Sequence, residues 1–194
     1  MIIGVAGYKG SGKDTIANVL QTSFGFEKMS FAQPIKDLIH YIFGIDKAIL
    51  SGDNGERIFR EEPMPEWFYL SPRDMMQKIG MAFRDELHKD IWVKVLERDI
   101  KNTKKNIVIP DVRFKNELEM VNKYGFCVGV HRPGYNGDDH RSEHGLDDVE
   151  FSKVFKNDSS QEMLYAQAYN YFKDKLKYEI NIWYWNKRFN RYSY

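Results

Sequence analysis

The sequence has a single cysteine, Cys127, and no long hydrophobic run among its 194 residues. A lone thiol cannot form an internal disulfide, which excludes a disulfide-stabilised secreted scaffold and is typical of a reducing cytosol. No apolar stretch approaches the roughly 20 residues of a membrane-spanning helix. The first residues are too short and too uncharged a segment to serve as a signal peptide. We therefore expect a cytoplasmic protein with no membrane partner.

Neither sign of charge is in excess, because 29 Lys and Arg face 28 Asp and Glu, for a formal net charge of +1. Such a chain offers no global field for nucleic acid, so any anion site must be a local cluster. The length and the 42% hydrophobic content suit one domain with a real core. We expect a single domain over residues 1–194.

A glycine-rich turn, GYKGSGKDT over residues 7–15, follows the apolar run Ile2–Ala6 and precedes a helix that begins near Lys13. This is the spacing of a phosphate-binding loop, in which backbone N–H groups and a helix N-terminus surround a polyphosphate. Lys13 would supply a point charge. Asp14 stands where Ser or Thr usually contacts magnesium, and the hydroxyl comes next, at Thr15. A purely structural turn is the alternative. The predicted phosphate ligands are Lys9, Gly10, Ser11, Gly12, Lys13, Asp14 and Thr15.

Short apolar segments alternate with helical periods along the rest of the chain. We predict strands at residues 26–31, 107–109, 126–131 and 154–155, and helices at 15–24, 34–43, 71–88, 90–100, 114–124 and 161–176. Gly25 and Gly125 are expected as C-terminal caps of helices. Apolar strands that alternate with helices indicate a parallel sheet covered on both faces. The predicted fold is therefore α/β, with three layers and about five parallel strands flanked by helices.

Three segments do not follow this alternation. Residues 45–70 mix Gly, Asn, Pro and charge, and we expect a mobile excursion there. Residues 132–149 form a polar loop in which His140, Glu143 and His144 lack the cysteine partners of a zinc site. A lid is the better interpretation, with a plain surface loop as the alternative. Residues 177–194 end in an aromatic tail that we expect to pack against the body or a second copy rather than to stack on nucleic acid.

Asp111 follows an apolar strand, at the edge of a parallel sheet where ligands bind. In a nucleotide-binding sheet an acidic residue at this place holds magnesium, usually through water. The alternative is a turn or helix cap. Asp14 could add an oxygen to the same metal, or it could simply favour the positive end of its helix.

The predicted helix from Ser71 carries Arg73, Gln77, Gly80 and Arg84 along one face, at intervals of three and four residues. A solvated polar face is the usual meaning of such a pattern. Gly80, however, costs about 1 kcal/mol in mid-helix relative to alanine, so a close approach is expected there. Two arginines and an amide also suit a phosphate and a nucleobase edge.

Arg113 and Arg132 follow the predicted third and fourth strands of the sequence, so they fall at the same rim of the sheet. Phosphoryl transfer needs in-line positioning and positive charge over the transferred group. The predicted catalytic residues are Lys13, Arg73, Arg84, Asp111, Arg113 and Arg132.

These segments together resemble the deoxynucleoside monophosphate kinases of tailed bacteriophages, relatives of the adenylate kinase group of P-loop kinases. The resembling segments are GYKGSGKDT (7–15), SFAQPIKD (30–37), RDMMQKIG (73–80) with Arg84 and Trp92, PDVRFKNE (110–117), HRP (131–133), HRSEHGL (140–146) and Asn157-Asp158. The resemblance implies Mg²⁺-dependent transfer of a phosphoryl group from ATP to a deoxynucleoside monophosphate. For a phage protein the expected location is the host cytoplasm.

The resemblance also implies roles for residues of this chain. Arg132 and residues 140–143 would form the lid, and Asn157 would lie near the adenine, although Ser159 replaces the usual glycine of that motif. The predicted magnesium ligands, Asp14 and Asp111, come from the residues themselves and not from the resemblance. The implied acceptor-binding residues are Phe31, Lys36, Arg73, Gln77, Arg84, Trp92, Asn116 and Glu117.

Two alternative functions remain at this point. A kinase of the same fold could phosphorylate another small molecule that already carries a phosphate. A non-enzymatic nucleotide-binding module is the other alternative, and the near-neutral charge disfavours a version that binds nucleic acid. Residues 45–70 and the aromatic tail match nothing in the resemblance.

Overall fold

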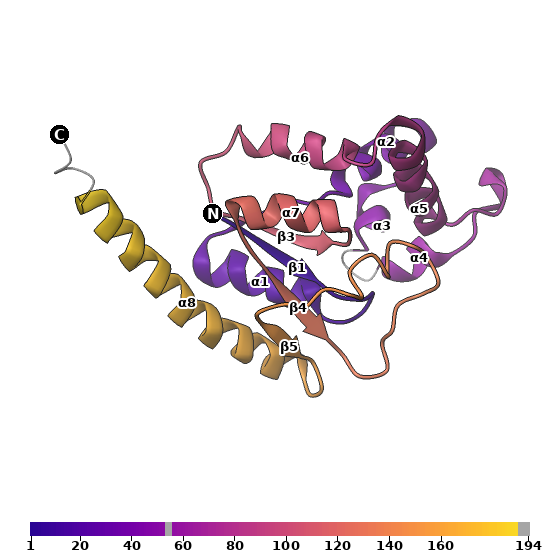
Figure 1. The fold of residues 1–194 in the computed structure, drawn as a ribbon. Coiled ribbons are helices and arrows are strands. Elements are labelled where there is room, and N and C mark those ends of the chain that lie inside the picture. The colour runs from indigo at the N-terminus through magenta and orange to yellow at the C-terminus, as the bar shows by residue number, and fades with distance from the viewer. Residues whose placement is uncertain (53–55, 190–194) are drawn as a thin grey trace.

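The computed structural model describes residues 1–52 and 56–189, and their side chains as far as Lys177. The predicted aromatic tail lies outside the described side chains. Five strands form one sheet in the order β2-β3-β1-β4-β5, and every adjacent pair is parallel, as predicted (Figure 1). The strands are β1 (Ile2–Ala6), β2 (Glu27–Lys28), β3 (Ile107–Val112), β4 (Gly125–His131) and β5 (Val154–Lys156).

Helices cover both faces of the sheet, which completes the three predicted layers. On one face, α1 (Lys13–Phe24) and α8 (Gln161–Phe189) bury Leu20 and Phe172 against the sheet. The other face carries the second core cluster, with residues such as Ile39, Trp92 and Val121. Its helices are α2 (Gln33–Phe43), α5 (Pro72–Ala82), α6 (Ile91–Ile100) and α7 (Lys115–Tyr124). All five residues of β1 are buried because this strand lies at the centre of the sheet.

Local sequence signals set several helix ends. Gly25 ends α1 in the left-handed conformation, with φ 70°, and its N–H bonds to the carbonyls of the last turn. Ser71 caps α5 by accepting a hydrogen bond from the Asp74 N–H, and Asp74 accepts in turn from the Ser71 N–H, a complete capping box. Helix α5 continues into η2 (Phe83–Leu87), a wider π-helical turn, so the predicted helix over 71–88 is confirmed.

Two predicted strand boundaries were wrong. The strand expected over 26–31 is limited to Glu27–Lys28, because Ser30 and the next two residues turn toward the Asp111 carboxylate. The strand expected at 107–109 continues through Pro110 and Asp111 to Val112, past a shift of register between Gly4 and Ala6.

Gly125 follows the last residue of α7, as predicted, but it does not have the left-handed conformation of a glycine cap. Its φ of 174° is extended backbone, and it is the first residue of β4, paired with Ile2. A Cβ at this position would overlap the Ile2 carbonyl oxygen. The glycine is needed for the close approach of two strands.

The final helix is longer than predicted, since α8 continues past Leu176 to Phe189. Figure 1 shows its C-terminal half leaving the body of the molecule. Within the described residues, no helix is long and apolar enough to cross a membrane.

Residues 45–70 contain local structure that the sequence did not suggest. They include α3 (Lys47–Ser51), α4 (Arg57–Glu61) and the 3₁₀ turn η1 (Pro65–Trp67). Leu50 is fully buried in the core, and both α3 and α4 pack against α5. The mobility expected for this segment stays a prediction. The loop over 132–149 has no helix or strand, as predicted.

Candidate functional site

A cavity of about 1230 Å³ opens at the carboxyl ends of the strands. It is lined by the glycine-rich loop, by α2, α4 and α5, and by the loop of residues 132–149, which was predicted above to be a lid and is called the lid loop below. Two predicted residues, Ser11 and Asn116, are not in its lining. The predicted residues that it brings together are Lys9, Gly10, Gly12, Lys13, Asp14, Thr15, Phe31, Lys36, Arg73, Gln77, Arg84, Trp92, Asp111, Arg113, Glu117, Arg132 and Asn157.

The glycine-rich loop has the backbone angles that its sequence predicts. Gly7, Gly10 and Gly12 have φ of 145°, 78° and 110°, values that residues with a Cβ rarely adopt. A Cβ on Gly12 would also lie 2.6 Å from the Leu164 side chain. Glycine at this position therefore serves both the turn and the packing of the loop against α8.

Several donors of this loop have no protein acceptor. Between Gly10 and Asp14, Ser11 is the only residue whose N–H has an acceptor within the described part of the chain, the Tyr8 carbonyl at 3.1 Å. The Ser11 hydroxyl is buried and has no hydrogen-bond partner there. Unpaired donors at a helix N-terminus are suited to an anion.

Lys13 supplies the positive charge of the loop. Its ammonium donates to the carbonyls of Gly7 and Tyr8, each at 2.6 Å. Burial, and then the nearby Arg113 guanidinium, lower the pKa of Lys13 to about 8. An anion beside the ammonium would oppose both effects.

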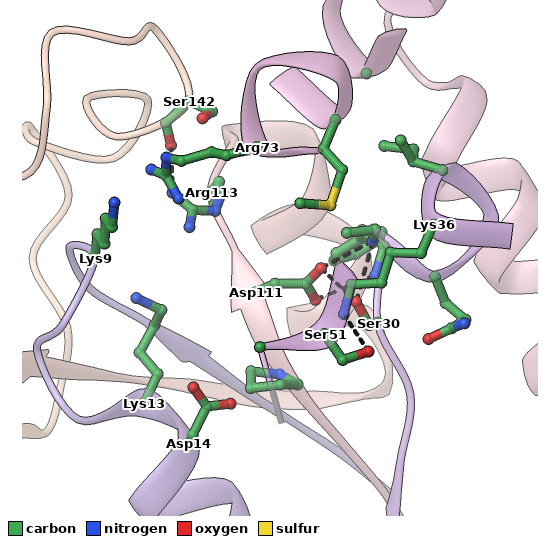
Figure 2. Close-up of a pocket in the computed structure, with 18 of the residues that line it drawn as sticks. Lys9, Lys13, Asp14, Ser30, Lys36, Ser51, Arg73, Asp111, Arg113 and Ser142 are labelled. Carbon is green, nitrogen blue, oxygen red and sulfur yellow. Dashed lines mark hydrogen bonds between the residues drawn. The ribbon is translucent and has the colours of Figure 1, made fainter. Parts of the chain in front are cut away.

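Arg73 and Arg113 point into the cavity opposite Lys9 and Lys13 (Figure 2). Arg113 donates to the Glu143 carboxylate and to the Ser142 carbonyl. Arg73 lies 2.7 Å from the Asp138 carboxylate and 3.5 Å from Glu143. Both carboxylates belong to the lid loop, so ion pairs join this loop to the rim of the sheet and to α5.

Glu143 is the centre of this network. Its side chain is fully buried, and its second oxygen accepts the Lys9 N–H at 2.7 Å. Burial alone would raise the pKa of Glu143, but the Arg113 guanidinium and the Lys9 amide outweigh it and hold the pKa below its usual value. A single carboxylate thus contacts the glycine-rich loop and the arginine that follows β3.

Arg84 and Glu117 form a second buried ion pair. Glu117 also accepts the N–H groups of Arg113 and Phe114, at 2.7 and 3.1 Å. The Arg84 guanidinium lies 4.1 Å from the centre of the Phe114 ring. Burial raises the pKa of Glu117 to about 7 against the opposing effect of Arg84. Glu117 therefore orients Arg84 and fixes the turn between β3 and α7.

Asp111 connects β3 to the start of α2. It accepts hydrogen bonds from the Ser30 hydroxyl and from the N–H groups of Phe31 and Ala32, at 2.7 to 3.1 Å. One of its oxygens, Oδ1, takes only the Phe31 N–H among the described donors. Asp14 is exposed and lies 3.3 Å from Lys28. Both acidic residues line the cavity, and no group of three metal-ligating side chains occurs in the described part of the chain.

Trp92, on α6, and Gly80, on α5, are in direct contact. The Trp92 indole N–H donates to the Gly80 carbonyl at 2.9 Å, and its ring stacks on Phe83. A Cβ on Gly80 would lie 3.1 Å from the Ile35 side chain. The close approach that the sequence predicts at Gly80 is therefore confirmed, and Ile35 makes it.

Four more predicted residues make contacts within the protein. Lys36 donates to the Ser51 hydroxyl at 3.3 Å, and Arg132 donates to the Gly10 carbonyl at 3.3 Å. The Asn157 amide donates to the Ser11 carbonyl at 2.9 Å. Asn116 donates to Lys89 and Asp90, away from the cavity lining.

Sequence reasoning missed the carboxylates that face the cations. Glu61, on α4, lies 2.8 Å from Lys9 and 3.7 Å from Arg73, and Asp138 holds Arg73 from the lid loop. Sequence reasoning also missed Arg60. The near-zero net charge was a signal for the carboxylates, because a chain with nearly equal numbers of acids and bases can pair each clustered cation with an acid.

Comparisons with known proteins agree on one family. A family model described as deoxynucleotide monophosphate kinase matches residues 1–65 and 56–168. A protein of Acanthamoeba polyphaga mimivirus, provisionally named a deoxynucleotide monophosphate kinase, is 34% identical, over 86% of this chain and 93% of its own. The deoxynucleoside-5′-monophosphate kinase of Escherichia phage T5 is 25% identical, over 62% of this chain and 71% of its own.

Solved structures give a more distant likeness. Shikimate kinase from Aquifex aeolicus has a TM-score of 0.46 and 11% identity, covering 91% of this chain and 98% of the other. Dephospho-CoA kinase from Campylobacter jejuni has a TM-score of 0.46 and 16% identity, covering 89% and 96%.

The substitution Glu143→Gln tests the buried network. It keeps the shape of the side chain but leaves Arg113 without its carboxylate, so we expect the free energy of unfolding to fall by about 3 kcal/mol. Urea unfolding measures this change. The exposed Glu150→Gln is the matched control and should change it by less than about 0.5 kcal/mol. Equal effects of the two substitutions would contradict a structural role for the Glu143 carboxylate.

Proposed function

The chain belongs to the deoxynucleotide monophosphate kinase family, and we propose that it transfers the terminal phosphoryl group of ATP to a deoxynucleoside monophosphate. The products are ADP and a deoxynucleoside diphosphate. One observation carries the proposal: a single cavity joins the unpaired donors of the glycine-rich loop to the arginines of α5 and β3. A phosphoryl donor and its acceptor must meet in one site that is shielded from water.

On the donor side, we assign the triphosphate of ATP to the loop of residues 9–15. The support is the set of free N–H groups and the buried Ser11 hydroxyl described above. Lys13 would turn from the carbonyls of Gly7 and Tyr8 to the β- and γ-phosphates. Asn157, beside the loop, would lie on the adenine side.

On the acceptor side, we assign the monophosphate to Arg73 and Arg84, with Gln77 and Lys36 nearer the nucleoside. Both arginines are largely buried, with side chains about one tenth exposed. Buried guanidinium groups held by carboxylates are preorganised for bidentate contact with phosphate oxygens. Phe31, which is buried beside the cavity, would pack against the nucleoside.

Phosphoryl transfer requires positioning and charge stabilisation from the protein, and little covalent chemistry. An oxygen of the acceptor phosphate attacks the γ-phosphorus, and the bond from that phosphorus to the β–γ bridging oxygen breaks, leaving ADP. Arg113 and Arg132 would lie over the transferred group and offset its charge. Magnesium, when bound, would neutralise the β- and γ-oxygens. Asp14, and Asp111 through its less occupied oxygen, would hold the ion by way of water, while the nucleotide supplies further ligands.

The ion pairs of Asp138 and Glu143 support a lid role for residues 132–149, because they hold this loop against two arginines that line the cavity. We propose one kinase domain over residues 1–194, with this loop closing over the donor.

A panel of ribo- and deoxynucleoside monophosphates, each with ATP and Mg²⁺, tests the proposed function. We expect diphosphate from at least one deoxynucleotide, measured by chromatography of the products. Lys13→Ala should lower kcat/KM by at least a hundredfold, about 2.7 kcal/mol of transition-state stabilisation. Lys123→Ala, an exposed control, should leave the rate unchanged. Product from a different phosphorylated metabolite only, or wild-type turnover in Lys13→Ala, would refute the assignment.

The pH dependence of ATP binding gives a separate test. The pKa of about 8 for Lys13 means that the free protein loses this charge as the pH rises from 7.5 to 9.5. We therefore expect the dissociation constant for ATP, measured by calorimetry, to rise about 25-fold over this range, because binding favours the protonated amine. In Lys13→Ala the affinity should be lower and independent of pH. A flat profile in the wild-type protein would show that the ammonium does not contact the nucleotide.

A further inference from the structure

Arg60, on α4, is the cavity arginine that has a buried side-chain nitrogen without a hydrogen-bond partner among the described residues. Its Nε is buried and has no hydrogen-bond partner, and no described carboxylate lies within 4 Å of its guanidinium. By contrast, Arg73, Arg84 and Arg113 each pair with a carboxylate. Burial of a cation without a partner is costly unless an anion joins it in the working state of the protein.

The neighbours of Arg60 are themselves cationic. Burial, followed by the guanidinium of Arg73 and smaller effects from Arg113 and Arg57, lowers the pKa of Arg60 to about 10. The next residue, Glu61, opposes this shift, but its carboxylate is already shared between Lys9 and Arg73. A local excess of positive charge therefore remains where α4 meets the cavity.

The contacts of Arg60 place its guanidinium near Gly52, which follows α3. A Cβ built on Gly52 would lie 3.6 Å from Arg60 Nη1, so the guanidinium extends toward the end of α3. Ser51, the last residue of α3, accepts the hydrogen bond from Lys36. Figure 2 shows Lys36 and Ser51 across the cavity from Lys9 and Lys13, with Asp111 between the two groups. Arg60 thus lies between the side of Lys36 and the side of Arg73.

From this placement we propose that Arg60 binds the phosphate of the acceptor nucleotide, as a third guanidinium beside Arg73 and Arg84. The inference rests on the proposed function. The planar fork of arginine matches two non-bridging oxygens of a phosphate monoester. The segment of residues 45–70 accordingly contributes a substrate-binding side chain, and does not merely cover the core.

The test compares Arg60→Gln with Lys104→Gln, a change at an exposed cation that does not line the cavity. Steady-state kinetics use ATP and the deoxynucleoside monophosphate that the wild-type protein converts fastest. For Arg60→Gln we expect the KM for the monophosphate to rise tenfold or more, and the KM for ATP to change less than twofold. Lys104→Gln should change both KM values by less than twofold. Arg60→Lys keeps the charge without the fork and should lie between wild type and Arg60→Gln.

Calorimetry identifies the group that is recognised. Arg60→Gln should lose affinity for the monophosphate but bind the corresponding deoxynucleoside, which lacks the phosphate, as the wild type does. A higher KM for ATP alone would place Arg60 on the donor side and overturn the inference, as would equal effects of the two glutamine variants. If Arg60→Gln does not fold, a wild-type KM in Arg60→Lys would overturn it as well. A wild-type protein that converts no deoxynucleotide would refute the proposed function itself, and this inference with it.

Discussion

The arrangement of this molecule depends on compensating the positive charge that gathers at the carboxyl edge of its sheet. Arg73, Arg84 and Arg113 are held there in largely desolvated positions, which is unfavourable unless anions lie beside them. Glu117 and Glu143 are the buried carboxylates that make this possible. Glu143 brings the lid loop to the glycine-rich loop, and Glu117 fixes the turn after β3. Charge pairing therefore helps to position the loops at this edge of the sheet, together with apolar packing.

Sheet topology makes these pairings available. Because β1 lies between β3 and β4, segments that are distant in the sequence end at one rim. Asp111, near the end of β3, accepts hydrogen bonds from residues 30–32, which lie 79 to 81 positions earlier in the sequence. These bonds fix the turn into α2. The carboxylates that hold these arginines in the free protein would therefore also fix the positions from which the arginines meet substrate phosphates.

Sequence alone predicted the features that local chemistry determines. The glycine-rich loop, the Ser71 cap and the parallel sheet follow from backbone angles, capping side chains and apolar periods, all of which operate within a few residues. The pairing of Arg113 with Glu143, across 30 positions, depends on tertiary contacts that no local pattern records. The place of Gly125 in β4 was missed for the same reason, since it depends on the close approach of its backbone to Ile2. The helices of residues 45–70 were missed because they are short and need the core contact of Leu50.

The central claim is that one cavity holds the phosphates of both nucleotides between the glycine-rich loop and the arginines. Inhibition by an adenosine joined to a deoxynucleoside through five phosphates tests it most directly. The account predicts that this single molecule inhibits competitively against ATP and also competitively against the deoxynucleoside monophosphate. Competition with only one of the two substrates would show that the donor and acceptor sites are not joined, and would contradict it.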